Sequence, residues 1–151
     1  MKVKIDYPSP TEELEIVERM AHLGPTPTAA VVLTPADLIA MRGGVEAVHL
    51  APSLREYIVR IVRATRVPAE FGLSVGPFLQ YGASPRGSIA LVLAAKAHAY
   101  LAGQTYATPD DVKAIAPDVL RHRLILSYEA DAAERTADDV LAEVLSAVKV
   151  P

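Results

Sequence analysis

A single arginine in an unusual position is the strongest chemical signal in the sequence. Residues 82–88 read Gly-Ala-Ser-Pro-Arg-Gly-Ser. Ser84 is the predicted N-cap of a helix, Pro85 its first residue and Arg86 its second. A cation in this first turn opposes the helix dipole and costs about 0.3–1 kcal/mol. Arg86 therefore either contacts an anion, most naturally a phosphate, or is a solvated or carboxylate-paired arginine, and the pattern alone favours the second.

The same segment does not qualify as an independent nucleotide-binding loop. It matches G-x-x-x-x-G-S, but no lysine follows the second glycine, so the positive charge that reaches the phosphates is missing. Ser84 has no adjacent histidine to act as a base, and its hydroxyl is expected to be engaged as a cap. We therefore expect no catalytic residue in this chain.

Metal binding, nucleic-acid binding and membrane insertion are also disfavoured. The chain has no cysteine, and its 4 histidines include no i, i+4 pair. A net charge of −3 argues against nucleic-acid binding through bulk charge. No apolar run reaches the roughly 18 residues of a membrane span, and no signal peptide is visible at the N-terminus. These features are typical of a cytoplasmic protein.

The elements that position Arg86 are predicted to be helices. Hydrophobic residues make up 51% of the 151-residue chain, largely through alanine, and charged residues 22%. Hydroxyl residues followed three positions later by an acid predict capping boxes beginning at Ser9, Thr34, Ser53, Thr108 and Thr136. Apolar residues at helical spacing follow these starts, which predicts an all-α bundle of about six helices.

Two of these helices are expected to be interrupted, and the longest has a predicted buried face. Gly43-Gly44 should break the second helix, and Pro117 should end a short fifth helix and restart it. The segment from Val67 to Gly82 is expected to be a long ordered loop. The longest helix follows it, with an apolar stripe of Ile89, Val92, Leu93, Ala97, Tyr100 and Leu101.

The first seven residues alternate apolar and polar side chains, which predicts a short strand. A lone strand cannot satisfy its backbone groups. Either it pairs with residues 29–33, the other β-like run, or its partners lie outside this chain.

Six segments, in order, carry a resemblance to a known family. They are Tyr-Pro-Ser at 7–9, Val-Arg-Ala-Thr-Arg at 62–66, Tyr-Gly-Ala-Ser-Pro-Arg at 81–86, Ala-Ala-Lys-Ala at 94–97, Tyr-Ala-Thr-Pro-Asp-Asp-Val at 106–112 and Val-Leu-Arg-His-Arg-Leu at 119–124. Together they resemble the C-terminal part of a MoxR-type AAA+ ATPase over nearly the whole chain. The resemblance implies the all-helical AAA+ lid that follows an α/β ATPase core. It also implies a division into residues 1–8, the end of the last core strand with the hinge, and residues 9–151, the lid.

The resemblance assigns nucleotide contacts to four residues. Arg86, with Ser84 in the same motif, would be the sensor-2 arginine that contacts the γ-phosphate and couples lid position to nucleotide state. Tyr7 and Pro8 would lie at the hinge, where related ATPases contact the adenine base, although a tyrosine packing a turn fits the same pattern. Whether Arg86 serves its own nucleotide or that of a neighbouring subunit stays open.

The same resemblance defines what this chain would need from elsewhere. Walker A and Walker B motifs and an arginine finger are absent, so we expect no hydrolysis by this piece alone. The family implies ATP and Mg²⁺ bound to an N-terminal ATPase core and a homo-oligomeric ring, expected to be a hexamer. Such machines are chaperone-like and assemble or activate other protein complexes.

Five further basic residues are candidates for contacts with the core or a neighbouring subunit: Arg63, Arg66, Arg121, His122 and Arg123. The alternative is that they are ordinary cations near helix C-termini, where positive charge is favourable. A rival function also stays open at this point. The chain could be a free-standing helical interaction module in which Arg86 is only a surface residue.

Overall fold

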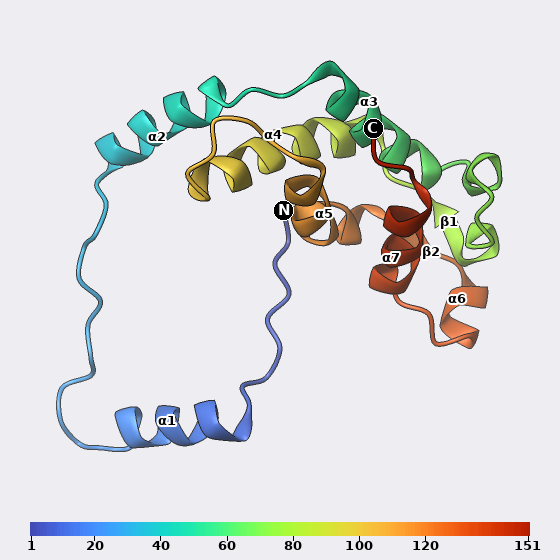
Figure 1. The fold of residues 1–151 in the computed structure, drawn as a ribbon. Helices are drawn as coiled ribbons and strands as arrows, with labels where there is room; N and C mark the ends of the chain where they lie inside the picture. The colour runs from blue at the N-terminus through green and yellow to red at the C-terminus, as the bar shows by residue number, and fades with distance from the viewer.

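Seven α-helices and one two-stranded sheet make up the computed structural model, which describes residues 1–151 (Figure 1). The helices are α1 (Pro10–Met20), α2 (Pro35–Ala47), α3 (Pro52–Ala64), α4 (Pro85–Leu101), α5 (Pro109–Leu120), α6 (Tyr128–Ala132) and α7 (Ala137–Ala147). The strands are β1 (Leu79–Tyr81) and β2 (Ile125–Leu126), and three short 3₁₀ turns are η1 (Pro68–Phe71), η2 (Gly76–Phe78) and η3 (Arg121–Arg123). The predicted all-α class is confirmed, with one helix more than expected.

The core lies among α3, α4, α5 and α7, and α4 and α5 make the most extensive contact in the chain. Each of the four helices buries residues at helical spacing, which leaves one apolar face per helix in the interior. The side chains that are almost completely buried on these helices include Tyr57, Ile58, Ile61, Val62, Leu91, Ala95, Ala99, Val112, Ala116, Val119, Leu120, Val140, Leu141 and Val144.

The predicted buried face of α4 is wrong. The helix turns Gly87, Leu91, Ala95 and Ala99 into the bundle, a set spaced four residues apart. Small residues at this spacing let α5 approach closely, so they take the interior position rather than the larger side chains. Half of the predicted stripe instead faces outward, with exposed fractions of 62% for Ile89, 53% for Leu93 and 74% for Leu101, and the other half is only partly buried.

Helix α1 lies apart from the bundle, joined to it by extended segments on both sides (Figure 1). Neither α1 nor α2 contains a buried residue. The apolar side chains of α1 are half or more exposed: Leu14, Ile16, Val17 and Met20. Helix α1 and its flanking segments therefore form an arm whose apolar residues have no partner within this chain.

The predicted N-terminal strand does not form within this chain, and its pairing with residues 29–33 is wrong. Residues 1–9 form no strand, and neither do residues 29–33, because the two segments run on opposite sides of the space between α1 and the bundle (Figure 1). Lys2 N–H instead donates a hydrogen bond to Asp118 O, at 2.7 Å, which ties the start of the chain to α5.

Four of the five predicted capping boxes are confirmed. In each, the hydroxyl accepts from the backbone N–H three residues on, while the acid accepts from the N-cap backbone: Ser9 with Glu12, Thr34 with Asp37, Thr108 with Asp111 and Thr136 with Asp139. The box at Ser53 is wrong, because α3 begins at Pro52 with Ala51 as its N-cap. Proline suits the first helical position, and it moves the serine inside the helix.

The two predicted helix breaks do not occur. Helix α2 continues through Gly43-Gly44, where the missing side chain makes room for a neighbour. A Cβ on Gly44 would lie 2.4 Å from Cε2 of Tyr100 on α4. Helix α5 likewise continues through Pro117 and ends at Leu120.

The buried hydroxyl of Thr65 joins the segment before α4 to the end of α3 through two hydrogen bonds. The Thr65 residue is 1% exposed, and its Oγ1 donates to Val62 O at 2.7 Å and accepts from Ala83 N–H at 2.9 Å. The backbones approach so closely here that a Cβ on Gly82 would lie 2.1 Å from Thr65 O. The approach to α4 is therefore fixed on both sides of the Gly82–Ala83 peptide.

The segment from Val67 to Gly82, which was expected to be a loop, contains a strand that makes a second contact holding the start of α4 in place. After η1 and η2, strand β1 pairs antiparallel with β2, with Leu79 opposite Leu126 and Tyr81 opposite Ile125. Strand β1 ends directly before Gly82, and β2 follows η3. The sheet therefore places the first turn of α4 beside η3, although about 35 residues separate them in sequence.

One buried carboxylate joins the start of α5 to α4. Asp111 is 3% exposed; its Oδ2 lies 2.7 Å from both Thr108 N and Thr108 Oγ1, and its Oδ1 lies 2.7 Å from His98 Nδ1. Burial alone would raise the pKa of Asp111, but the hydrogen bonds from Thr108 and His98 outweigh it and lower that pKa below its ordinary value.

Replacing Asp111 with asparagine should lower the free energy of unfolding at pH 7 by about 1–3 kcal/mol, because the amide nitrogen cannot accept one of these hydrogen bonds. Chemical denaturation measures the change. Asp110→Asn is the control, since Asp110 is exposed in the same first turn and its loss should change stability by less than about 0.5 kcal/mol.

The stability of Asp111→Asn should also depend less on acidic pH than that of the wild type. A lowered native pKa stabilises the fold above the ordinary carboxyl pKa of 3.8, and that contribution is lost as the pH falls from there through the lower native value. The wild type should therefore lose more stability than Asp111→Asn in this range. Equal acid sensitivity of the two proteins would contradict the assignment.

Thr65→Val should destabilise the bundle by about 1–3 kcal/mol, because it leaves the buried Ala83 N–H without an acceptor while keeping the shape of the side chain. Thr65→Ser retains the hydroxyl and should lose clearly less. Urea denaturation of the two variants makes the comparison, and an equal loss in both would show that the hydroxyl is not what holds this contact.

Candidate functional site

The first turn of α4 presents Arg86 to solvent. Its side chain makes no hydrogen bond and no ion pair with any residue of the chain. No acid lies in this turn or in that of α3, whereas the first turns of α1, α2, α5 and α7 each contain at least one. The carboxylate-paired alternative for Arg86 is therefore excluded within this chain, and its charge is available to an outside anion.

Ser84 occupies the predicted N-cap position, with extended backbone angles of φ −74° and ψ 169°. Its hydroxyl, however, makes no capping hydrogen bond, so the prediction that it is already engaged is wrong. Gly87 N–H donates to Ser84 O at 2.8 Å instead, and this backbone bond closes the turn without the side chain. The hydroxyl beside Arg86 is consequently available too.

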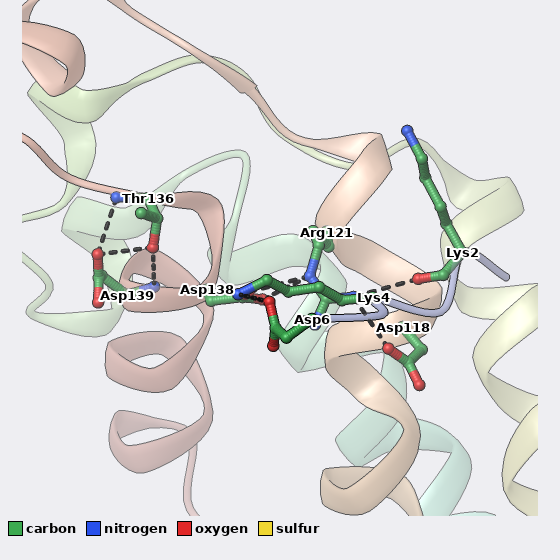
Figure 2. Close-up of polar contacts among 8 residues, drawn as sticks. All are labelled: Lys2, Lys4, Asp6, Asp118, Arg121, Thr136, Asp138 and Asp139. Carbon is green, nitrogen blue, oxygen red and sulfur yellow. Dashed lines mark hydrogen bonds and ion pairs between the residues drawn. The ribbon is translucent and has the colours of Figure 1, made fainter. Parts of the chain in front are cut away.

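Arg121 forms hydrogen bonds and ion pairs with other residues of the chain (Figure 2). Its Nε lies 2.8 and 3.0 Å from the two carboxylate oxygens of Asp138, and its Nη1 lies 2.9 Å from Asp118 Oδ1 and 3.1 Å from Lys2 O. The hydrogen bonds with Asp138 and Asp118 raise the pKa of Arg121. This network joins α5, α7 and the N-terminal segment, so Arg121 is a structural residue in the isolated chain.

The other two residues of η3, His122 and Arg123, form no ion pair with a carboxylate. His122 is exposed, and partial desolvation together with the positive charges of Arg123, the N-terminal amine, Lys2 and Arg121 lowers its pKa. Arg123 is half-buried, and its only hydrogen bond runs from Nε to Val119 O, at 2.9 Å. The surface around η3 is therefore locally positive.

Of the two arginines near the end of α3, one forms an ion pair within the chain and the other does not. Arg63 Nη2 lies 2.7 Å from Glu70 Oε2 in an exposed ion pair with η1. Arg66 is exposed and has no ion-pair partner, and its backbone adjoins Gly82, four residues before Arg86. Arg66 can therefore reach an anion that approaches the segment before α4, whereas Arg63 would first have to leave Glu70.

The structure does not bring the predicted hinge residues to Arg86. Tyr7 is completely exposed, and with Pro8 it belongs to the segment that leads away from the bundle to α1 (Figure 1). The fold thus assembles Arg86, Ser84, Arg66, His122 and Arg123 around the start of α4 and η3. Sequence patterns gave no signal for the residues that hold this arrangement, which are Thr65 and the two short strands.

No group of three or more histidine, aspartate or glutamate side chains is placed to hold a metal ion. None of the helices combines the length and the apolar character needed to cross a membrane.

Comparison with known proteins identifies the family of the chain. Residues 74–144, which run from before η2 into α7 and include Arg86, match the family model of the AAA lid domain. The solved structure of a Cytophaga hutchinsonii protein assigned as an ATPase has a TM-score of 0.92 and 34% sequence identity. The likeness covers 100% of this chain, the α1 arm included, and 46% of that one.

Curated relatives extend the match to sequence. The chain is 40% identical to Chaperone MoxR1 of Mycobacterium tuberculosis over 99% of its own length and 40% of that protein. Protein MoxR of Paracoccus denitrificans is 32% identical over 84% of this chain and 41% of the relative. The chain thus spans about two-fifths of the length of these relatives. It carries an AAA lid domain and is homologous over nearly its whole length to MoxR-type AAA+ ATPases.

Proposed function

We propose that this chain is the lid of an ATP-hydrolysing, chaperone-like AAA+ machine and that Arg86 contacts the γ-phosphate of its nucleotide. The observation that carries the proposal is an exposed arginine in the first turn of α4, without a carboxylate to neutralise it. A phosphate at this place would be favoured by the guanidinium and by the helix dipole together.

The uncovered apolar faces support an ATPase core domain as the main partner. An open cavity of about 540 Å³ lies between helices α2 and α4. Its lining is mostly apolar and includes Leu38, Met41, Val45 and Leu93. The arm offers further exposed apolar residues on α1. More than half of the C. hutchinsonii chain lies outside the region that this chain matches, which leaves room for a core domain there.

The chemistry of hydrolysis would come from that core. ATP with Mg²⁺ supplies the reactive phosphoryl group and the metal that neutralises developing charge. This chain would contribute positive charge at Arg86 and a hydroxyl at Ser84. In this proposal residues 1–8 lead from the core into the lid of residues 9–151, with Tyr7 and Pro8 at the hinge beside the adenine base.

Nucleotide state would reach the rest of the machine through the rigidity of the lid. The first turn of α4 is fixed to α3 by Thr65 and to η3 by the pairing of β1 with β2. A force on Arg86 would therefore rotate the whole bundle rather than bend one loop. Rotation of the lid against neighbouring subunits in a homo-oligomeric ring would transmit that state.

A free-standing interaction module is the alternative, and the cavity between α2 and α4 favours it as well, because an apolar surface of that kind also suits a protein partner. The two functions differ in the part they give Arg86. It is central to the first and irrelevant to the second.

Arg86→Ala in the ATPase that contains this chain should lower kcat for ATP hydrolysis by about 10-fold or more, because a charge-assisted contact to the transferred phosphoryl group is lost. Steady-state turnover measures it. Arg55→Ala is the matched control, since Arg55 is an exposed arginine of α3 without an ion pair, about ten residues before Thr65. Turnover unchanged by Arg86→Ala, or lowered equally by both substitutions, would support the interaction module instead.

A further inference from the structure

Arg123 lies beside the first turn of α4, the turn that carries Arg86. The antiparallel pairing of Leu79 with Leu126 and of Tyr81 with Ile125 brings η3 to this place. A methyl group on Gly87, the residue after Arg86, would lie 3.7 Å from Cδ of Arg123. The aliphatic part of one arginine therefore packs against the turn that carries the other.

The guanidinium of Arg123 is held in position but not neutralised. Its Nε donates to Val119 O at 2.9 Å, and its two terminal nitrogens donate to no group of the chain. No carboxylate lies within ion-pair distance of Arg123 or of Arg86. This differs from Arg121, two residues earlier, whose charge is matched by Asp118 and Asp138.

The surroundings add positive charge rather than compensate it. His122 is exposed beside Arg123, and Lys2 is among the charges that lower the pKa of His122. Like charges that lie close together without counter-charges repel one another, and a bound anion relieves this repulsion. A half-buried arginine with a fixed Nε and free terminal nitrogens presents its remaining donors in one direction, which suits the tetrahedral oxygens of a phosphate.

We infer that Arg123 and Arg86 form a two-arginine site for the terminal phosphate of a nucleoside triphosphate. This inference rests on the proposed function and adds a second ligand to it. Arg123 is the fixed member, oriented by Val119 O, and Arg86 is the exposed member that closes on the phosphate. The pair would distinguish a triphosphate from a diphosphate, because only the triphosphate places an oxygen-rich group between the two side chains.

The test compares the affinities of a non-hydrolysable ATP analogue and of ADP in the ATPase that contains this chain. Arg123→Ala should weaken binding of the analogue by about 10- to 100-fold, the usual effect of losing a hydrogen bond to a charged group. Binding of ADP should change by less than about threefold. Arg86→Ala should act in the same direction, and the double variant should lose less than the product of the two single losses.

Arg123→Lys and Arg55→Ala are the controls. Lysine keeps a charge and most of the stem that packs on Gly87, so this variant should fold, retain part of the affinity and still discriminate less well than arginine. Arg55→Ala should leave both affinities unchanged. Thermal unfolding of each variant confirms that the lid is intact.

The outcomes separate the two proposals. If Arg86→Ala lowers the preference for the triphosphate and Arg123→Ala does not, the inference is overturned and the proposed function stands. An equal loss of ADP and analogue in Arg123→Ala also overturns it, since Arg123 would then hold the fold or a carboxylate of the core. If neither variant changes the preference, the proposed function fails and the inference fails with it.

Discussion

The position of Arg86 depends on one crowded contact between two backbones. Thr65 Oγ1 donates to Val62 O at the end of α3, and the same buried oxygen accepts from Ala83 N–H. Only a residue without a Cβ fits at Gly82, because Thr65 O lies where that atom would be. With no freedom on either side of this peptide, α4 can start in one direction only, and its first turn faces the same side of the lid as η3.

Charge at the N-termini of the helices follows a common pattern, from which α4 departs. Four helices are closed by a hydroxyl and an acid, and their carboxylates stabilise the positive ends of the helix dipoles. Helix α4 has neither, although Ser84 stands at the position where a cap would form. Helix α3 likewise has no side-chain cap and no acid in its first turn, but its N-cap is an alanine, whereas α4 has a free hydroxyl and an unpaired arginine at its N-terminus. A phosphate at the start of α4 would account for both of these free groups.

The sequence was most informative where the structure is determined locally. Capping boxes at Ser9, Thr34, Thr108 and Thr136 depend on neighbours three residues apart, and all of them form. The outward face of α4 and the continuous α2 were mispredicted because packing between helices decides them. The hydrogen bond of Thr65 and the β1–β2 pair join residues 18 and more than 40 positions apart, and such short, isolated signals cannot be distinguished from loop sequence.

Helix α4 is the element in which these observations meet. Its inner face of Gly87, Leu91, Ala95 and Ala99 is packed into the bundle, so the helix cannot move independently of α5. Its outer apolar face is uncovered, and its first turn holds Arg86. A helix of 17 residues is about 25 Å long. A contact at one end would therefore displace an apolar surface along the whole length, and the partner that covers this surface would respond to the phosphate without touching it.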